Sequence, residues 1–352
     1  MDGEKGRVII APDEHELSVF SGNKLQYEKL LTEAEKTERT ACVTKNGTAV
    51  HLFANIGRSE EASEIAAHFL EGVGLFRTEY LFLGRKIPPS KNEHYSAYLH
   101  AAEQLEGRIL TIRTLDLGGD KIPEFVKKKM ETNPTIGMRG LRFSLQEEEL
   151  FTTQIAALLK LSRTKPVRIL FPMVMGGSDF QKAADIVEST AERLRVPSIP
   201  PLGAMIETPA AVFSIEEILK RADFISIGTN DLTQLILAAD RNEAGLVDYY
   251  SVLHPSVLRA VQQVAEKAIE YGVEVSICGE AGGNYKLTPL FIGMGIRHFS
   301  MTPKSAARIH RSICSINTDE AEKLSRMALT RESAEAVQQV INDFNSVVFS
   351  DR

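Results

Sequence analysis

The chain has 352 residues, of which 43% are hydrophobic and 25% are charged, and its formal net charge is −6. These proportions are typical of a globular protein with a large core, and the acidic balance argues against nucleic acid as the main partner, because phosphate backbones select basic surfaces. No apolar run reaches the ~18 residues of a membrane span, so we expect no membrane insertion. The N-terminal sequence has no signal-peptide core, and the three cysteines lack the spacing of disulfides or of a metal site. We therefore expect a cytoplasmic protein.

The first 45 residues are predicted to precede the main fold. Segments 7–11 and 17–20 have a β-like composition but are too short to bury a core alone. Residues 23–40 carry apolar side chains at helical spacing on a charged segment, which predicts one amphipathic connecting helix. We therefore place a linker helix within residues 21–45 and assign residues 46–352 to the main domain.

The main domain begins with a turn and continues as a strand–helix alternation. Asn46 and Gly47 stand between two alternating runs, a strong hairpin signal. Eight short apolar runs then alternate with segments of helical periodicity, which favours an α/β fold and a closed (β/α)8 barrel of the TIM type. Residues from 282 onward are expected to form closing helices. The expected strands are 50–56, 72–76, 108–113, 135–141, 167–174, 202–207, 224–229 and 273–278.

Charged and reactive side chains stand at the ends of most of these strands. In (β/α)8 barrels the active site lies at the C-terminal strand ends, because the loops there converge over one opening. A buried charge is costly unless it is paired or binds a ligand, so we expect these side chains to face one another. They are Arg77, Arg113, Arg139, Glu207, Asn230, Asp231 and Cys278.

The arginines and carboxylates favour a small anionic ligand held with a metal ion. Arginine binds oxyanions through two parallel hydrogen bonds, so several arginines suit phosphate and carboxylate groups. Glu207 and Asp231 supply only oxygen, which suits Mg²⁺. Two alternatives stay open: single arginines can form ion pairs at the barrel rim, and the carboxylates can neutralise arginines without a metal. Asp231 can also act only as the N-cap of the following helix.

Two further positions have both an ordinary and a functional interpretation. Cys278 precedes a glycine-rich loop in "SICGEAGG"; it is either a small buried hydrophobe or a reactive thiol at the barrel opening. Lys121 in "GGDK" belongs either to a phosphate-binding loop or to an ordinary turn.

Eight motifs follow one another along the main domain: "GVGLFRTEYLFLGR", "TIRTLDLGGDK", "NPTIGMRGLRFSL", "ILFPMV", "MIETPAA", "SIGTNDLTQLILAADR", "LHPSVL" and "SICGEAGG". In this order they resemble the phosphoenolpyruvate-utilising enzyme family, and within it most closely the phosphoenolpyruvate–protein phosphotransferases of bacterial sugar uptake. The resemblance covers residues from about 48 to 315.

The resemblance implies how the substrate is held. Arg77 and Arg113 would bind the phosphate and carboxylate end of phosphoenolpyruvate, and Arg139 and Arg241 would complete the anion clamp. Asn230 would contact the substrate as well.

The resemblance also implies the metal site and the proton donor. Glu207 and Asp231 would bind Mg²⁺, with Asp231 also contacting the substrate, and Cys278 would protonate the product. Family members dimerise through this domain, so a homodimer is expected.

The family's phosphoryl acceptor is a histidine of a separate swivelling domain, in a "GG-x-x-S-H" motif that this sequence lacks. Residues 1–20 look like the tail of that domain. The resemblance therefore implies the substrate-binding half of an enzyme that passes a phosphoryl group to the swivel histidine, and then to a histidine-containing phosphocarrier protein, releasing pyruvate.

Three positions depart from the family pattern. Met138 stands where an aromatic residue is common, Arg241 lacks the glycine that often follows it, and "CGEAGGN" replaces the usual "CGELAGD". The last change leans toward the dikinase branch, so a fragment of a pyruvate phosphate dikinase or phosphoenolpyruvate synthase stays an alternative. The other is a non-catalytic module that senses phosphoenolpyruvate, against which the retained Cys278 argues.

Overall fold

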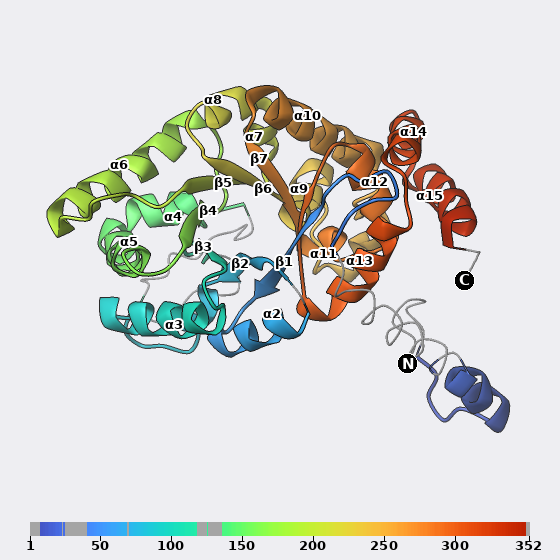
Figure 1. Cartoon of the computed structure of the whole chain (residues 1–352), viewed down its shortest axis with the longest axis horizontal. Helices are drawn as coiled ribbons and strands as arrows, with labels where there is room; N and C mark the ends of the chain where they lie inside the picture. Colours follow the sequence, from blue (N-terminus) through green and yellow to red (C-terminus); the bar gives the residue numbers. More distant parts are fainter. Residues whose placement is uncertain are drawn as a thin grey trace.

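The computed structural model describes residues 8–22, 24, 41–68, 70–117, 125 and 136–349. Eight parallel strands form a closed barrel in sequence order, with helices outside it (Figure 1). This architecture confirms the expected (β/α)8 barrel. The strands are β1 (His51–Ile56), β2 (Gly72–Arg77), β3 (Ile109–Arg113), β4 (Val167–Phe171), β5 (Leu202–Ile206), β6 (Phe224–Gly228), β7 (Glu274–Cys278) and β8 (His298–Met301).

Helices and short 3₁₀ turns connect the strands and cover the barrel. Two C-terminal helices extend this layer on one side, because α14 packs on α12 and α15 packs on α14. In chain order the helices are η1 (Ser59–Ser63), α2 (Glu64–Ala67), η2 (Glu79–Leu81), α3 (Lys91–Gln104), α4 (Leu141–Gln146), α5 (Glu148–Ser162), α6 (Gly177–Leu194), α7 (Pro209–Phe213), α8 (Ile215–Leu219), α9 (Thr229–Leu237), η3 (Ala244–Tyr249), α10 (Pro255–Tyr271), α11 (Gly279–Gly282), α12 (Thr288–Gly293), η4 (Pro303–Ser305), α13 (Ala306–Cys314), α14 (Thr318–Leu329) and α15 (Ala334–Phe349).

One predicted strand was wrong, and one strand lies among the residues from 282 onward that were expected to form only closing helices. The described part of 135–141 forms a turn at residues 136–140, and α4 follows it. The eighth strand is instead β8, which pairs with β7 and β1. Its four residues include a histidine and a serine, which makes the run too short and too polar to stand out. Arg139 therefore lies on a loop, and Cys278 ends the seventh strand.

The segment before the barrel is described only in part. Residues 17–20, expected to be β-like, are helical. Most of the predicted linker helix, 23–40, lies outside the described residues, and the domain boundaries stay a prediction. The expected turn at Asn46 is present: Gly47 has φ +83°, a conformation that glycine adopts without strain, and Val43 pairs with Ala49 in antiparallel fashion.

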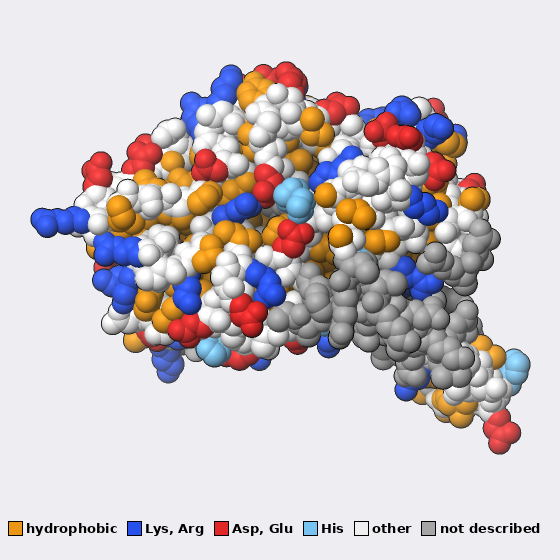
Figure 2. Space-filling model, viewed as in Figure 1, with side chains coloured by type: hydrophobic (Ala, Val, Ile, Leu, Met, Phe, Trp, Pro, Cys, Tyr) orange, Lys and Arg blue, Asp and Glu red, His pale blue; other side chains and the backbone are white. Residues whose placement is uncertain are grey.

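Charges of both signs lie on the face of the molecule drawn in Figure 2. Acidic and basic side chains are interspersed over the face in Figure 2, with no extended basic area among its described residues. No helix in the described ranges combines the length and apolar content of a membrane span.

A buried histidine makes the stability of the helix layer sensitive to pH. His94 on α3 is 1% exposed, and its Nδ1 lies 2.9 Å from the hydroxyl of Tyr98. Burial lowers the pKa of His94 to about 4 from an ordinary value of 6.5. Between these two values the unfolded chain binds a proton that the folded chain does not, so stability decreases as the pH falls through this range.

We expect the protonation of His94 in the unfolded chain to lower the free energy of unfolding by about 2 kcal/mol between pH 7 and pH 4.5. The variant His94→Gln keeps a polar partner for Tyr98 but cannot titrate, so its stability should depend less on pH. Urea unfolding of both proteins at the two pH values measures the difference. The same pH dependence in both proteins would show that His94 titrates normally in the fold.

Candidate active site

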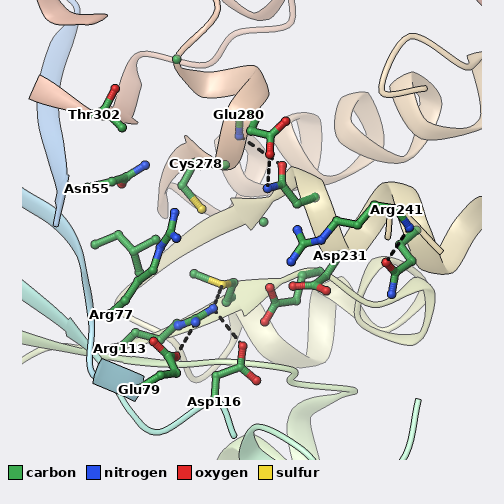
Figure 3. Close-up of a pocket in the computed structure, with 18 of the residues that line it drawn as sticks. Asn55, Arg77, Glu79, Arg113, Asp116, Asp231, Arg241, Cys278, Glu280 and Thr302 are labelled. Carbon is green, nitrogen blue, oxygen red and sulfur yellow. Dashed lines mark hydrogen bonds and ion pairs between the residues drawn. The ribbon is translucent and has the colours of Figure 1, made fainter. Parts of the chain in front are cut away.

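The C-terminal ends of the strands surround one cavity of about 530 Å³ (Figure 3). The structure brings together there the eight described residues for which the sequence suggested a role. They are Arg77, Arg113, Arg139, Glu207, Asn230, Asp231, Arg241 and Cys278. Lys121 lies outside the described residues.

Arg113 is held by two carboxylates at the edge of the cavity. It is the last residue of β3 and is 9% exposed, and its guanidinium lies 2.5 Å from Glu79 and 3.1 Å from Asp116. Burial favours a lower pKa of Arg113, but these carboxylates outweigh it and raise the pKa above its ordinary value, so the side chain stays charged. Its buried Nε has no hydrogen-bond partner among the described residues, which leaves a donor for a ligand.

Arg139 links the same carboxylate to the opposite side of the cavity. Its guanidinium lies 3.0 Å from Asp116 and 3.2 Å from Asp231. The next residue, Gly140, has φ +57°, and a Cβ there would lie 2.6 Å from the Cβ of Met173. Glycine therefore permits the tight turn that brings Arg139 into the ion-pair network.

Glu207 and Asp231 are the oxygen donors for a possible cation. Glu207 follows β5, is 1% exposed, and accepts a 2.7 Å hydrogen bond from the Met173 N–H. A Cβ at Gly228 would lie 2.7 Å from Glu207 Oε2, so a glycine is needed beside this carboxylate. Burial, followed by the charges of Asp231 and Asp116, raises the pKa of Glu207 to about 8. These buried carboxylates repel one another, and a cation between them would offset that repulsion.

The donor set fits Mg²⁺ in part. Glu207 and Asp231 offer the hard oxygen ligands that Mg²⁺ prefers, and this ion commonly uses one or two protein carboxylates with substrate and water oxygens. Within the described ranges, no group of three or more His, Cys, Asp or Glu side chains is arranged to hold a metal. A Mg²⁺ ion here would therefore need further oxygens from the ligand or water.

Asn230 and Asp231 lie in the first turn of α9, directly after β6. The N-cap of this helix is Gly228, so Asp231 is not the cap. Asn230 Oδ1 accepts a 3.1 Å hydrogen bond from the Glu280 N–H, which ties α9 to α11. Arg241 follows α9 and points into the cavity from the side opposite Arg77 (Figure 3).

Cys278 ends β7 and faces the same cavity. It is 2% exposed, and its thiol donates to the carbonyl oxygen of Ile227 at 3.3 Å. Burial, and then the charge of Glu207, raise the pKa of Cys278 to about 11, although Arg113 and Arg77 oppose this. The thiol therefore keeps its proton at neutral pH, the form needed for an acid rather than a nucleophile.

Sequence reasoning missed Glu79 and Asp116, the partners of the buried arginines. Both lie in the cavity lining, within motifs whose arginines were singled out. One general rule could have found them, because each buried arginine needs a carboxylate partner. Glu79 stands two residues after Arg77, and Asp116 stands three residues after Arg113.

Comparisons with known proteins agree with this geometry. Residues 32–318 match the family described as PEP-utilising enzyme, PEP-binding domain, where PEP is phosphoenolpyruvate. A phosphoenolpyruvate-protein phosphotransferase of Listeria innocua is 35% identical over 98% of this chain and 61% of its own length. Relatives of the same name from Listeria monocytogenes and Staphylococcus aureus are 34% identical, with the same coverage of 98% and 61%.

The chain thus spans less than two thirds of the length of these curated relatives. A solved citrate lyase from Burkholderia xenovorans covers 56% of this chain at 14% identity with a TM-score of 0.38, too low to support an argument. The family match covers most of the chain and every residue of the cavity lining. The chain therefore belongs to the PEP-utilising enzymes and contains their PEP-binding domain.

Proposed function

We propose that the cavity binds phosphoenolpyruvate together with Mg²⁺, as one half of a phosphoenolpyruvate–protein phosphotransferase. The observation that carries this proposal is the lining: among the described residues, four arginines and five carboxyl side chains meet in one cavity. Arginine side chains suit the phosphate and carboxylate groups of this ligand. A divalent cation between Glu207 and Asp231 would offset the repulsion that helps to raise the pKa of Glu207, while the arginines would balance the anion.

The arginines and Asn230 would hold the substrate. Arg77 and Arg113 would bind its phosphate and carboxylate, using the buried Nε donor of Arg113. Arg139 and Arg241 would close the clamp from the other side. These contacts also stabilise the charge that develops on the phosphoryl oxygens during transfer.

In the complete reaction, the histidine of a swivel domain would attack phosphorus in line with the bridging oxygen. The N–P bond forms as the P–O bond breaks, and the electron pair stays on the enolate. Cys278 then donates its thiol proton to the enolate carbon, which gives pyruvate, and the thiolate regains a proton from water. Mg²⁺ held by Glu207 and Asp231 would offset the negative charge of phosphoryl and enolate oxygens.

The names of the relatives support this wider assignment. We propose that the phosphoryl group passes from the swivel histidine to a histidine-containing phosphocarrier protein of a sugar phosphotransferase system. We also propose a homodimer, as the family resemblance implies, and a cytoplasmic location, which the cysteine pattern favours.

Phosphoenolpyruvate affinity is expected to rise with Mg²⁺ by about 5- to 150-fold, the usual range for two coupled ligands. Asp231 is paired with Arg139, so a cation that attracts Asp231 releases guanidinium N–H groups for the substrate. Calorimetric titration of the chain with phosphoenolpyruvate, in Mg²⁺ or in EDTA at equal ionic strength, measures the coupling. The variant Glu207→Gln should bind with much less dependence on Mg²⁺. Equal affinity in both buffers for the wild type would contradict the proposed site.

A further inference from the structure

A buried glutamine outside the cavity connects the two strand ends that carry much of the cavity's charge. Gln154 on α5 is 1% exposed. Its Oε1 accepts a 3.0 Å hydrogen bond from the Leu115 N–H, and its Nε2 donates to Thr78 Oγ1 at 3.2 Å and to the Tyr98 hydroxyl at 2.9 Å. Both amide hydrogens and the amide oxygen are therefore in use.

These contacts lie beyond the last paired residues of β2 and β3. The strand pairing ends at Arg77 opposite Arg113. Past that point, Thr78 Oγ1 donates to the Arg113 carbonyl oxygen at 2.9 Å, and the Gln154 amide joins Thr78 to Leu115. The joined segments carry four charged residues of the cavity lining, namely Arg77, Glu79, Arg113 and Asp116.

The groups around Gln154 fix the donor and the acceptor of each of its three hydrogen bonds. The Thr78 hydroxyl donates to Arg113, so it accepts from Gln154. The Tyr98 hydroxyl also accepts from Gln154, and it lies 2.9 Å from Nδ1 of His94, whose ring is neutral at pH 7 because burial lowers its pKa to about 4. A reversed amide would set its NH₂ group against the Leu115 N–H. The side chain at this position must therefore accept from the Leu115 N–H and donate to the hydroxyls of Thr78 and Tyr98, which glutamine can do.

We propose that Gln154 is a positioning residue for phosphoenolpyruvate binding. It fixes the separation of the β2 and β3 ends, and thereby the positions of Arg77, Arg113 and their carboxylate partners. It is not part of the cavity lining and acts through the Thr78 hydroxyl and the Leu115 backbone N–H. This inference rests on the proposed function for its ligand, but the hydrogen-bond arrangement does not depend on the ligand.

The test compares two variants of the same network. Gln154→Leu removes the bridge, and we expect phosphoenolpyruvate affinity in Mg²⁺ to fall by about 10- to 100-fold, because small misplacements of binding groups have effects of this size. Tyr98→Phe removes only the hydroxyl at the far end and leaves the bridge intact. It should lower the melting temperature yet keep an affinity close to that of the wild type. Affinity losses in both variants that simply follow their stability losses would overturn the proposal.

A third variant supplies a pH signature. Gln154→Glu has the same length, and its protonated carboxyl keeps an acceptor for Leu115 and a donor for Thr78, whereas the ionised form has no donor. Burial raises the pKa of such a carboxyl. Its affinity should therefore be near that of the wild type at low pH and fall relative to the wild type as the pH rises. A constant ratio across the range would count against the proposal.

Amide hydrogen exchange separates this inference from the proposed function. In Gln154→Leu, exchange should accelerate in the segments around Thr78 and Leu115, whereas in Tyr98→Phe it should not. If the wild type does not bind phosphoenolpyruvate but this pattern appears, the proposed ligand is wrong and the positioning role stands. If exchange in Gln154→Leu matches the wild type, or this variant binds the ligand normally, the positioning role is wrong.

Discussion

Replacing Cys278 with serine is expected to slow pyruvate formation by about 10²- to 10⁴-fold, the usual contribution of a general acid. The hydroxyl keeps a donor for the Ile227 carbonyl oxygen, so fold and phosphoenolpyruvate affinity should change little. Serine is a far weaker acid than a thiol, and the loss should therefore fall on the protonation of the enolate. Pyruvate release is measured after adding a swivel domain that carries the acceptor histidine, and the chain without that domain gives the background.

A second cysteine serves as the control for this experiment. Cys314 ends α13 and is not part of the cavity lining, so Cys314→Ser should turn over like the wild type. If Cys278→Ser also keeps the wild-type rate, and Cys278→Ala only melts at a lower temperature, then Cys278 is a packing residue and the proton comes from elsewhere.

Removing the Arg113 side chain is expected to cost about 2–5 kcal/mol of phosphoenolpyruvate binding, the range for breaking a desolvated charge pair. Arg113→Ala removes the paired guanidinium and its buried Nε donor. Arg113→Lys keeps a charge without the planar fork, and it should lie between the alanine variant and the wild type. Calorimetry in Mg²⁺ gives the affinities, well below the melting temperature of each variant.

The control is an arginine at the other end of the barrel. Arg168 on β4 lies 2.5 Å from Glu274 on β7 but is not part of the cavity lining. Arg168→Ala should weaken the fold without changing the affinity. Equal affinity losses in Arg113→Ala and Arg168→Ala would mean that destabilisation, and not lost substrate contacts, explains the result.

The sequence was sufficient for the architecture because most strands are continuous apolar runs. The runs at 202–207 and 224–229 correspond to β5 and β6, in which every residue is buried. The strand predicted at 135–141 was wrong because local apolar composition does not distinguish a strand from a turn followed by a helix. The strand β8 was not predicted, because its own composition does not indicate a strand. Its pairing with β1 and β7 stabilises it instead.

The candidate site was predicted in its residue types but not in its internal pairing. Arginines and carboxylates that follow apolar strands have few places to lie except the barrel opening. Which carboxylate pairs with which arginine depends on loop conformation, such as the turn at Gly140, and no local pattern encodes it. The roles assigned to Glu207, Asp231 and Cys278 stay predictions until the variants are measured.

The short strand β8 also constrains the order in which this chain can fold. β1 has no partner on one side until residues 298–301 have been synthesised, and the buried hydrogen bond from Asn55 to the Ser300 carbonyl oxygen joins residues 245 positions apart. A growing chain that ends before β8 exposes two open sheet edges, from β1 and β7, and such edges invite pairing with other chains. We therefore expect this short and polar strand to protect the nascent chain from such pairing, because it covers both edges at once.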